Sequence, residues 1–233
     1  MVGCAVSDLL FRLISVEFNH HQRGIMKKHK TYGSWESPIT ASKVASDSTG
    51  LSEVRVHNGD VYWLELRPSE GGRMVVVKWS EEVGVSDIIP EGYNARSRVH
   101  EYGGGSYHLV GDDVYFVNFE DQRVYRKAVG ESPRPITPDN ERRYADFTYN
   151  EKMGLLWSVC EDHGVGDGNP ENFLVSLSPE GERKGEVVTR GSDFYSSPRF
   201  SPDGSKVVWF TWNHPDMPWD ATQLHLGELT GDG

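Results

Sequence analysis

The feature that most constrains the fold of this chain is a short aromatic strand pattern that recurs four times. Each copy is a run of apolar residues around a large ring, and three of the four follow a turn of Gly, Asn, Asp or Pro. The rings belong to Trp63, Phe116, Trp157 and Trp209, at intervals of 53, 41 and 52 residues. A period of about 40–50 residues with several strands per unit is typical of β-propeller blades.

Each repeat also has room for further strands on both sides of the aromatic one. Earlier strands are predicted over 52–56, 106–110 and 197–200, and later strands over 74–78, 123–128, 172–177 and 222–226. Hardly any window after residue 50 sustains a 3.6-residue period, so long helices are not expected. We therefore predict an all-β fold, an incomplete β-propeller of about four blades, because closed propellers commonly contain more.

The chain divides into a short extension, residues 1–30, and a partial propeller, residues 31–233. The extension is expected to be helical or disordered, and because charges at Asp8, Arg12 and Glu17 interrupt its apolar stretch, a secretory signal is not expected. An open ring leaves blade faces and strand edges uncovered. We therefore expect either a longer product or a partner that covers them.

Composition narrows the possible partners. The formal net charge is −11, which disfavours nucleic acid because phosphate backbones demand clustered Lys and Arg. No stretch approaches the roughly 18 apolar residues of a membrane span. Cys4 and Cys160 lie too far apart in sequence for a CxxC site and form no disulfide framework. With no metal-ligand spacing either, we expect a cytoplasmic protein that needs no metal and no cofactor.

Three segments go beyond general propeller features: Arg96 to Gly105, which contains HEYGGG; Asn118 to Arg126; and Ser197 to Asp220, which ends in NHPDMPWD. Together they resemble the N-terminal propeller of the prolyl oligopeptidase family of serine peptidases, in its acylaminoacyl-peptidase and dipeptidyl aminopeptidase-like branch. The resemblance covers about residues 27–230. It implies a propeller that precedes an α/β-hydrolase domain with a Ser-Asp-His triad and limits access to short peptides.

The catalytic half of that family is not recognisable in this sequence. A nucleophile elbow needs G-x-S-x-G, and the nearest match, which begins at Gly104, ends in His108. We therefore predict no catalytic residue and no α/β-hydrolase domain in the chain, which is not expected to be active alone. The resemblance implies the access and substrate-selecting part of a peptidase that removes acylated amino acids or dipeptides. The alternative is a non-catalytic propeller that serves as a protein-interaction platform.

Four charged residues are candidates for substrate binding: Arg96, Arg98, Glu101 and Glu161. In a strand, residues 96, 98 and 100 would share one face and Glu101 would take the other. A guanidinium suits a substrate carbonyl or carboxylate, and a carboxylate suits the amino end of a peptide. Glu161 is expected at a strand end where it could meet such an amine. The alternative is a set of structural ion pairs.

Three further segments admit two interpretations each. Trp212, His214 and Trp219 belong to an ordered loop that either packs on the hydrolase domain or packs on itself. The loop at 161–171 is rich in oxygen ligands but breaks the calcium-binding order, so a polar loop is favoured. Tyr102 to Gly105 could be an oxyanion loop, but a backbone kink at the start of a strand is favoured.

Overall fold

The protein is described from a computed structural model, which covers residues 29–46, 48–165, 168–181 and 185–229. It divides into two compact units, residues 1–40 and 41–233. The described part of the first unit, residues 29–40, contains neither helix nor strand. Most of the predicted extension, residues 1–28, lies outside the described residues, so the boundary near residue 30 stays a prediction.

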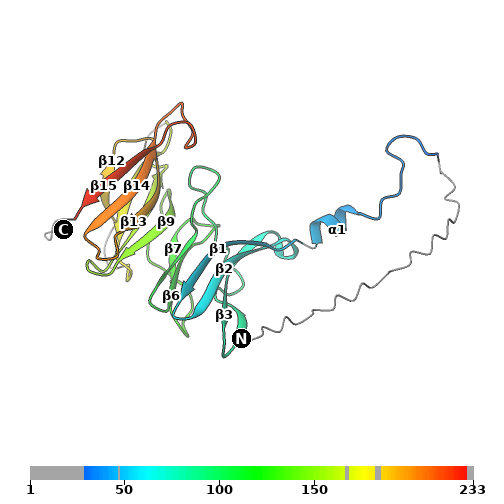
Figure 1. Cartoon of the computed structure of the whole chain (residues 1–233), viewed down its shortest axis with the longest axis horizontal. Coiled ribbons are helices and arrows are strands. Elements are labelled where there is room, and N and C mark those ends of the chain that lie inside the picture. The colour runs from blue at the N-terminus through cyan, green and yellow to red at the C-terminus, as the bar shows by residue number, and fades with distance from the viewer. Residues whose placement is uncertain (1–28, 47, 166–167, 182–184, 230–233) are drawn as a thin grey trace, which may run out of the picture. The chain divides into compact units, whose positions relative to one another are not determined.

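The second unit is built almost entirely from antiparallel sheets (Figure 1). In the described residues its helices are one short α-helix, α1 (Ala41–Ser46), and one 3-10 turn, η1 (Pro68–Glu70). None of the described helices is long and apolar enough to cross a membrane.

Four consecutive sheets form the blades of a propeller, and each sheet follows the order of the sequence. Blade 1 contains β1 (Gly50–His57), β2 (Asp60–Arg67), β3 (Arg73–Ser80) and β4 (Gly84–Asp87). Blade 2 contains β5 (Tyr107–Val110), β6 (Asp113–Val117), β7 (Val124–Lys127) and β8 (Arg134–Pro135). Blade 3 contains β9 (Arg142–Asn150), β10 (Leu155–Asp162), β11 (Glu171–Leu177) and β12 (Glu186–Arg190). Blade 4 contains β13 (Phe194–Phe200), β14 (Lys206–Trp212) and β15 (Gln223–Glu228).

The predicted repeat is confirmed. Trp63, Phe116, Trp157 and Trp209 lie on β2, β6, β10 and β14, the second strand of each blade. The described chain contains four blades, as expected for an incomplete propeller, and no region in which strands alternate with long helices as in a hydrolase domain. The sequence did not predict β9, nor the outer strands β4, β8 and β12.

The hydrophobic core lies in the seams between neighbouring blades. One cluster joins blades 1 and 2 through Leu64 and Phe116, both fully buried. A second joins blades 2 and 3, where Tyr115 packs with the group around Phe147. A third joins blades 3 and 4 and includes Tyr195. Rings and β-branched side chains from facing sheets thus fill the seams, and burial of this apolar surface holds the blades together.

Bulges in the first strand of three blades add polar links across the seams. Glu53, Asp146 and Ser197 adopt left-handed φ angles of 50°, 54° and 52°, and the strand register shifts around each of them. The Glu53 carboxylate accepts from the Ser106 N–H at 3.0 Å. The Asp146 carboxylate accepts from Gly105 N–H at 2.6 Å and from Ser197 N–H at 3.0 Å. In these three links blades 1 and 3 supply carboxylate acceptors and blades 2 and 4 supply backbone donors, and the Asp146 N–H also donates to the Gly105 carbonyl at 2.8 Å.

The glycine run before β5 permits this close approach. A Cβ at Gly104 would lie 2.9 Å from the Ala145 Cβ, and one at Gly105 would lie 3.0 Å from Asp146 Oδ1. Glycine is needed here because a Cβ at either position would overlap with side-chain atoms of blade 3. The structure therefore favours the kink at the start of a strand over an oxyanion loop for this segment.

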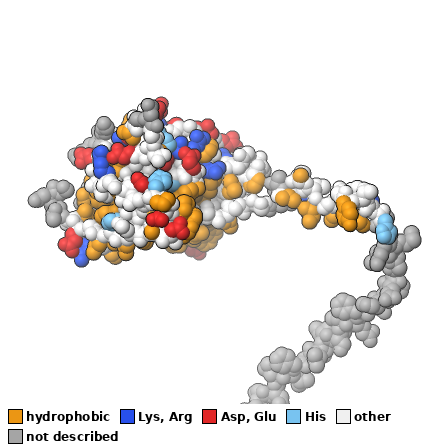
Figure 2. Space-filling view, turned by 90° about the horizontal axis from the view of Figure 1, so that it is seen from above, with side chains coloured by type: hydrophobic (Ala, Val, Ile, Leu, Met, Phe, Trp, Pro, Cys, Tyr) orange, Lys and Arg blue, Asp and Glu red, His pale blue; other side chains and the backbone are white. Residues whose placement is uncertain are grey.

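The outward faces of the first and last blades carry exposed apolar side chains. On blade 1, Leu51 and Val56 are exposed, and on blade 4 so are Leu224 and Leu226. Figure 2 shows hydrophobic side chains that reach the surface of the strand-rich unit among charged ones. Within the described residues, no sheet packs on these two faces as the four blades pack on one another.

Candidate functional site

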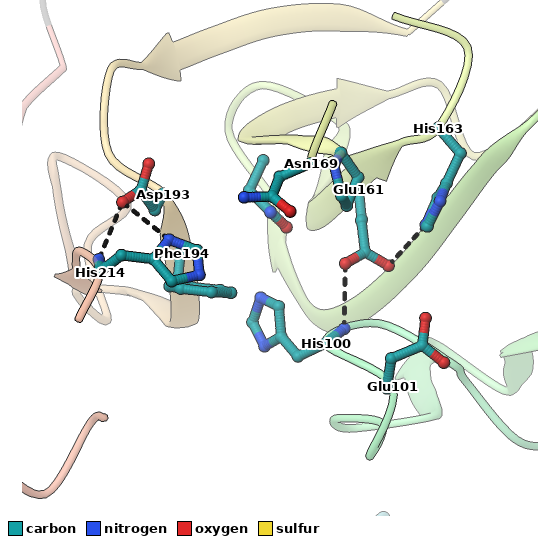
Figure 3. Close-up of a pocket in the computed structure, with 10 residues that line it drawn as sticks. His100, Glu101, Glu161, His163, Asn169, Asp193, Phe194 and His214 are labelled. Atoms are coloured by element: carbon teal, nitrogen blue, oxygen red, sulfur yellow. Dashed lines mark hydrogen bonds and ion pairs between the residues drawn. The ribbon is translucent and has the colours of Figure 1, made fainter. Parts of the chain in front are cut away.

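A cavity of about 300 Å³ opens where five segments of the propeller meet (Figure 3). One wall comes from the end of β10 and the start of β11, and the opposite wall comes from the residues around the start of β13 and the loop after β14. The turn at His100 and Glu101, which precedes β5, closes the base between them in the view of Figure 3. Blades 3 and 4 therefore position most of the site.

The expected strand over 96–101 is wrong, because residues 96–98 are irregular and residues 99–102 form a turn. The Glu101 N–H donates to the Arg98 carbonyl at 2.9 Å, and Gly103 N–H donates to the Val99 carbonyl at 2.8 Å. His100 and Glu101 both adopt left-handed φ angles, 56° and 66°. Two successive left-handed residues reverse the chain, so both side chains lie at the cavity instead of on opposite faces of a strand.

Glu161 and Glu101, both predicted as binding residues, are brought together by an arginine. Glu161 is the second-to-last residue of β10, and it is only 3% exposed. Its carboxylate accepts from the His100 N–H at 3.3 Å and pairs with His163 Nε2 at 3.0 Å. The Arg143 guanidinium lies 3.4 Å from Glu161 and 2.7 Å from Glu101. Its hydrogen bond and charge hold the pKa of Glu101 below the usual value.

Arg143 was not identified from the sequence. It lies near the start of β9, a strand that the sequence did not predict, and it is next to a second arginine whose partner is Asp162. The adjacent pair Arg142-Arg143 was the available sequence signal. On a strand, neighbouring side chains point to opposite faces, so the two guanidiniums would be expected to have different partners.

Arg96 and Arg98 do not line the cavity. Both side chains are exposed, and their guanidiniums lie over the Phe119 ring, 5.2 Å and 4.2 Å from its centroid. Only the backbone of Arg98 takes part in the glutamate cluster, because its carbonyl accepts from Arg143 at 3.0 Å. The structure therefore separates the predicted arginines from the predicted glutamates.

The opposite wall of the cavity is aromatic. Phe194 stacks on Trp212 with ring centroids 5.3 Å apart and planes 12° apart, and it contacts His214 at 4.8 Å. His100 meets both Phe194 and Trp212 edge to face, at 5.3 Å and 5.4 Å. Asp193 fixes His214, because its carboxylate accepts from the backbone N–H at 2.9 Å and lies 3.1 Å from Nδ1.

The three residues of the loop predicted to face another domain therefore differ in their surroundings. Trp212 is 4% exposed and belongs to the packed wall, and His214 lines the cavity. Trp219 is 76% exposed and lies outside the cavity lining. A domain-facing role for these three residues stays a prediction.

Two buried polar atoms in the cavity wall have no hydrogen-bond partner. They are His100 Nε2 and Asn172 Oδ1, and Asn172 is only 3% exposed. A buried polar atom without a partner costs about 1–3 kcal/mol. Burial lowers the pKa of His100, while the charge of Glu161 and the nearby Asn172 amide oppose that shift.

The charges of the site favour a cation. Three carboxylates line the cavity, from Glu101, Glu161 and Asp193, and the neighbouring Arg143 offsets only part of their charge. No group of three His, Cys, Asp or Glu side chains in the described residues is arranged to hold a metal ion. The arrangement suits an ammonium group, which donates three hydrogen bonds and carries one positive charge.

Comparison with known proteins places this arrangement in context. No family model matches the sequence, and no curated protein matches it. Among solved structures, a puromycin-hydrolyzing peptidase from Mycobacterium tuberculosis is 33% identical, with a TM-score of 0.79 over 88% of this chain. A puromycin hydrolase is 32% identical, with a TM-score of 0.77 over the same share. TolB from Acinetobacter baumannii, at 15% identity and a TM-score of 0.50, shares only the fold.

The chain spans about a third of the length of the two peptidases, 34% in each case. The matched part is a propeller, and the described residues contain nothing that corresponds to a hydrolase domain.

Proposed function

Since this chain belongs to the prolyl oligopeptidase family of serine peptidases, as the propeller portion of its members, we propose that it forms the access and substrate-selecting part of an enzyme that acts on short peptides. The peptide bond would be cleaved by a serine of an α/β-hydrolase domain outside the described residues. The propeller contributes selection of the substrate and no catalytic group.

The observation that carries this proposal is the acidic cavity at Glu161. Glu161 and Glu101, joined by Arg143, supply the carboxylates of this wall. A peptide with a free amino end brings the matching donors. The nitrogen of an acylated residue carries no charge, so the cavity favours release of dipeptides from a free amino end over release of acylated amino acids.

The size of the cavity supports a role in selection. Pockets that bind drug-sized molecules enclose about 300–1,000 Å³, and this cavity, at about 300 Å³, lies at the lower limit. It has room for one residue at the end of a peptide and not for an internal segment of a folded chain. A substrate held here by its first residue would be positioned by its end, as an exopeptidase requires.

The remaining parts of the proposal come from the sequence pattern and from the family. We place the enzyme in the cytoplasm, with residues 1–30 as an extension and residues 31–233 as the propeller. The loop that carries Trp212, His214 and Trp219 would face the hydrolase domain. No cofactor is needed, because a serine, a histidine and backbone donors suffice for acyl transfer.

The proposal is tested with the purified chain and two tripeptides, triglycine and N-acetyltriglycine, in a calorimetric titration. We expect the free peptide to bind about ten- to a hundred-fold more tightly than the acetylated one, as hydrogen bonds between charged groups allow. E101Q should weaken the binding of the free peptide, while E82Q, at an exposed glutamate in blade 1, should not. The chain alone should not hydrolyse either peptide.

Equal binding of the two peptides, or hydrolysis by the purified chain, would contradict the proposal. A chain that binds neither peptide would favour the alternative function, a non-catalytic interaction platform.

A further inference from the structure

We infer that the first strands of blades 1, 2 and 4 together form a binding site for an oxyanion with two negative charges, held by Arg55, His108 and Arg199. None of these residues lines the cavity at Glu161, so the inference goes beyond the proposed function and does not depend on it. The ligand is a free dianion or the phosphate group of a phosphate ester.

The three residues stand at one level of the propeller. Each lies on the first strand of its blade, β1, β5 or β13. Arg55 and Arg199 both follow the bulge residue of their strand by two positions, where blade 3 has the neutral Thr148. His108 joins them because β5 and β13 both pack beside β9, and the charges of both arginines act on its ring.

Both charges that act on His108 are positive. The pKa of His108 is lowered to about 3, mainly by burial and further by Arg55 and Arg199, and no acidic group opposes this shift. His100 at the cavity differs, because the charge of Glu161 opposes the lowering of its pKa. At His108 the positive charge is therefore not offset by an acidic side chain of the described chain.

Arg55 is held in place but keeps donors for a ligand. Its guanidinium lies over the Tyr107 ring, 5.1 Å from the centroid, and a hydrogen bond from Arg55 opposes the rise that burial causes in the pKa of Tyr107. The Glu53 carboxylate is near enough for its charge to interact with Arg55, but it accepts from the Ser106 N–H at 3.0 Å. A guanidinium has several N–H donors, so one bond to a neutral hydroxyl leaves others available.

Arg199 and His108 supply donors from two further strands. Arg199 is exposed, and its Nη1 donates to the Pro198 carbonyl at 2.6 Å. His108 Nδ1 is buried without a partner, whereas Nε2 is not among the buried unpartnered atoms of the described chain. The neutral imidazole can therefore carry its proton on Nε2 and donate it to a ligand. Two guanidiniums match the oxygens of phosphate or sulfate, and their two charges match a dianion.

The experiment follows the His108 ring signals of the purified chain by NMR while sulfate is added at pH 7. Sodium chloride keeps the ionic strength constant, so general screening does not change during the titration. We expect saturable binding of sulfate. Acetate, which carries a single charge, should bind several-fold more weakly.

Phenyl phosphate distinguishes the two sources of the ligand. Binding as tight as that of sulfate supports the site and identifies a phosphate ester as its ligand. Binding weaker by about ten-fold or more supports the site and identifies a free ion, because the ester carries the same kind of charged group on a bulky ring.

A matched pair of variants locates the binding. R199Q removes one guanidinium and should weaken sulfate binding about ten- to a hundred-fold, as expected for hydrogen bonds between charged groups. R199K keeps the charge without the planar fork and should give an intermediate affinity. R190Q, at an exposed arginine of β12, is the control and should leave sulfate binding unchanged. R55Q should match R199Q, and if R55Q does not fold, R199Q decides because Arg199 is exposed.

Two results would overturn the inference. One is a set of His108 signals that shift without saturation, and the other is equal weakening of sulfate binding by R199Q and R190Q. Acetate that binds as tightly as sulfate would overturn the selection of a dianion. None of these results bears on the proposed function, which the tripeptide titration tests by itself.

Discussion

The seams between blades and the outer faces of the first and last blades are made from the same kinds of residue but differ in their surroundings. Phe116 in the seam of blades 1 and 2 is fully buried, whereas Phe210 on blade 4 is 39% exposed. The strands supply apolar side chains to both faces of each sheet. A face becomes part of the hydrophobic core only where a neighbouring sheet packs on it. Stability should therefore be concentrated at the three described seams.

The largest expected effect breaks a seam. F116A should lower the free energy of unfolding by about 3–5 kcal/mol, because it removes a buried ring that contacts Tyr93 and Tyr125 and leaves a cavity. F210A is the matched control and should cost less than about 1 kcal/mol, because its ring is partly in solvent already. Urea unfolding of both variants measures the difference. Similar losses would mean that the outer face of blade 4 is packed as well.

The polar links should contribute less than the rings. D146A removes the acceptor of two N–H groups, from Gly105 and Ser197, and should cost about 2–4 kcal/mol if each loss follows the usual penalty. D216N, at an exposed aspartate in the loop after β14, should change little. Urea unfolding again provides the measurement. A loss below about 0.5 kcal/mol for D146A would show that the apolar contacts alone hold blades 2, 3 and 4 together.

A partly buried histidine of β5, His108, should make the stability of the chain depend on pH. Burial, with the charges of Arg55 and Arg199 as smaller causes, lowers the pKa of His108 to about 3. The unfolded chain takes up this proton near pH 6.5 and the folded chain does not, so stability falls as the pH drops from about 6.5 toward 3. Between pH 7 and pH 5 the unmodified chain should lose about 2 kcal/mol more than H108Q.

Unfolding titrations at the two pH values measure this difference. The same pH dependence in both proteins would contradict it and would assign the effect to other groups.

The smallest effect is expected on the uncovered face of blade 4. L224S and L226S replace exposed leucines and should each change the free energy of unfolding by less than about 0.5 kcal/mol. Both should reduce self-association of the purified chain, because exposed apolar patches promote it. Light scattering and urea unfolding provide the two readings. A loss above about 2 kcal/mol would show that these leucines are covered in solution.

The sequence predicted the second and third strands of every blade, because their apolar runs lie beside clear turns. It missed β8, which has two residues, and β12, whose side chains alternate with little apolar content. It also missed β9, which begins with two arginines. Outer strands are half exposed and carry a weak apolar pattern, so periodicity cannot find them.

The candidate site was predicted only in part for a different reason. Glu101 was predicted on a strand and Glu161 at a strand end, but their common partner Arg143 comes from a distant strand. The left-handed turn at His100 and Glu101 also gave no signal, since neither residue is glycine. Phe194 and Asn172 reach the cavity only because the blades are arranged around it.

Carboxylate acceptors and backbone donors alternate from blade to blade, and this pattern has a consequence for hydrogen bonding beyond blade 4. Ser197 occupies the bulge position of blade 4, where blades 1 and 3 have Glu53 and Asp146, and its hydroxyl carries no charge. The polar pattern would therefore continue beside blade 4 only if the neighbouring sheet supplied the carboxylate.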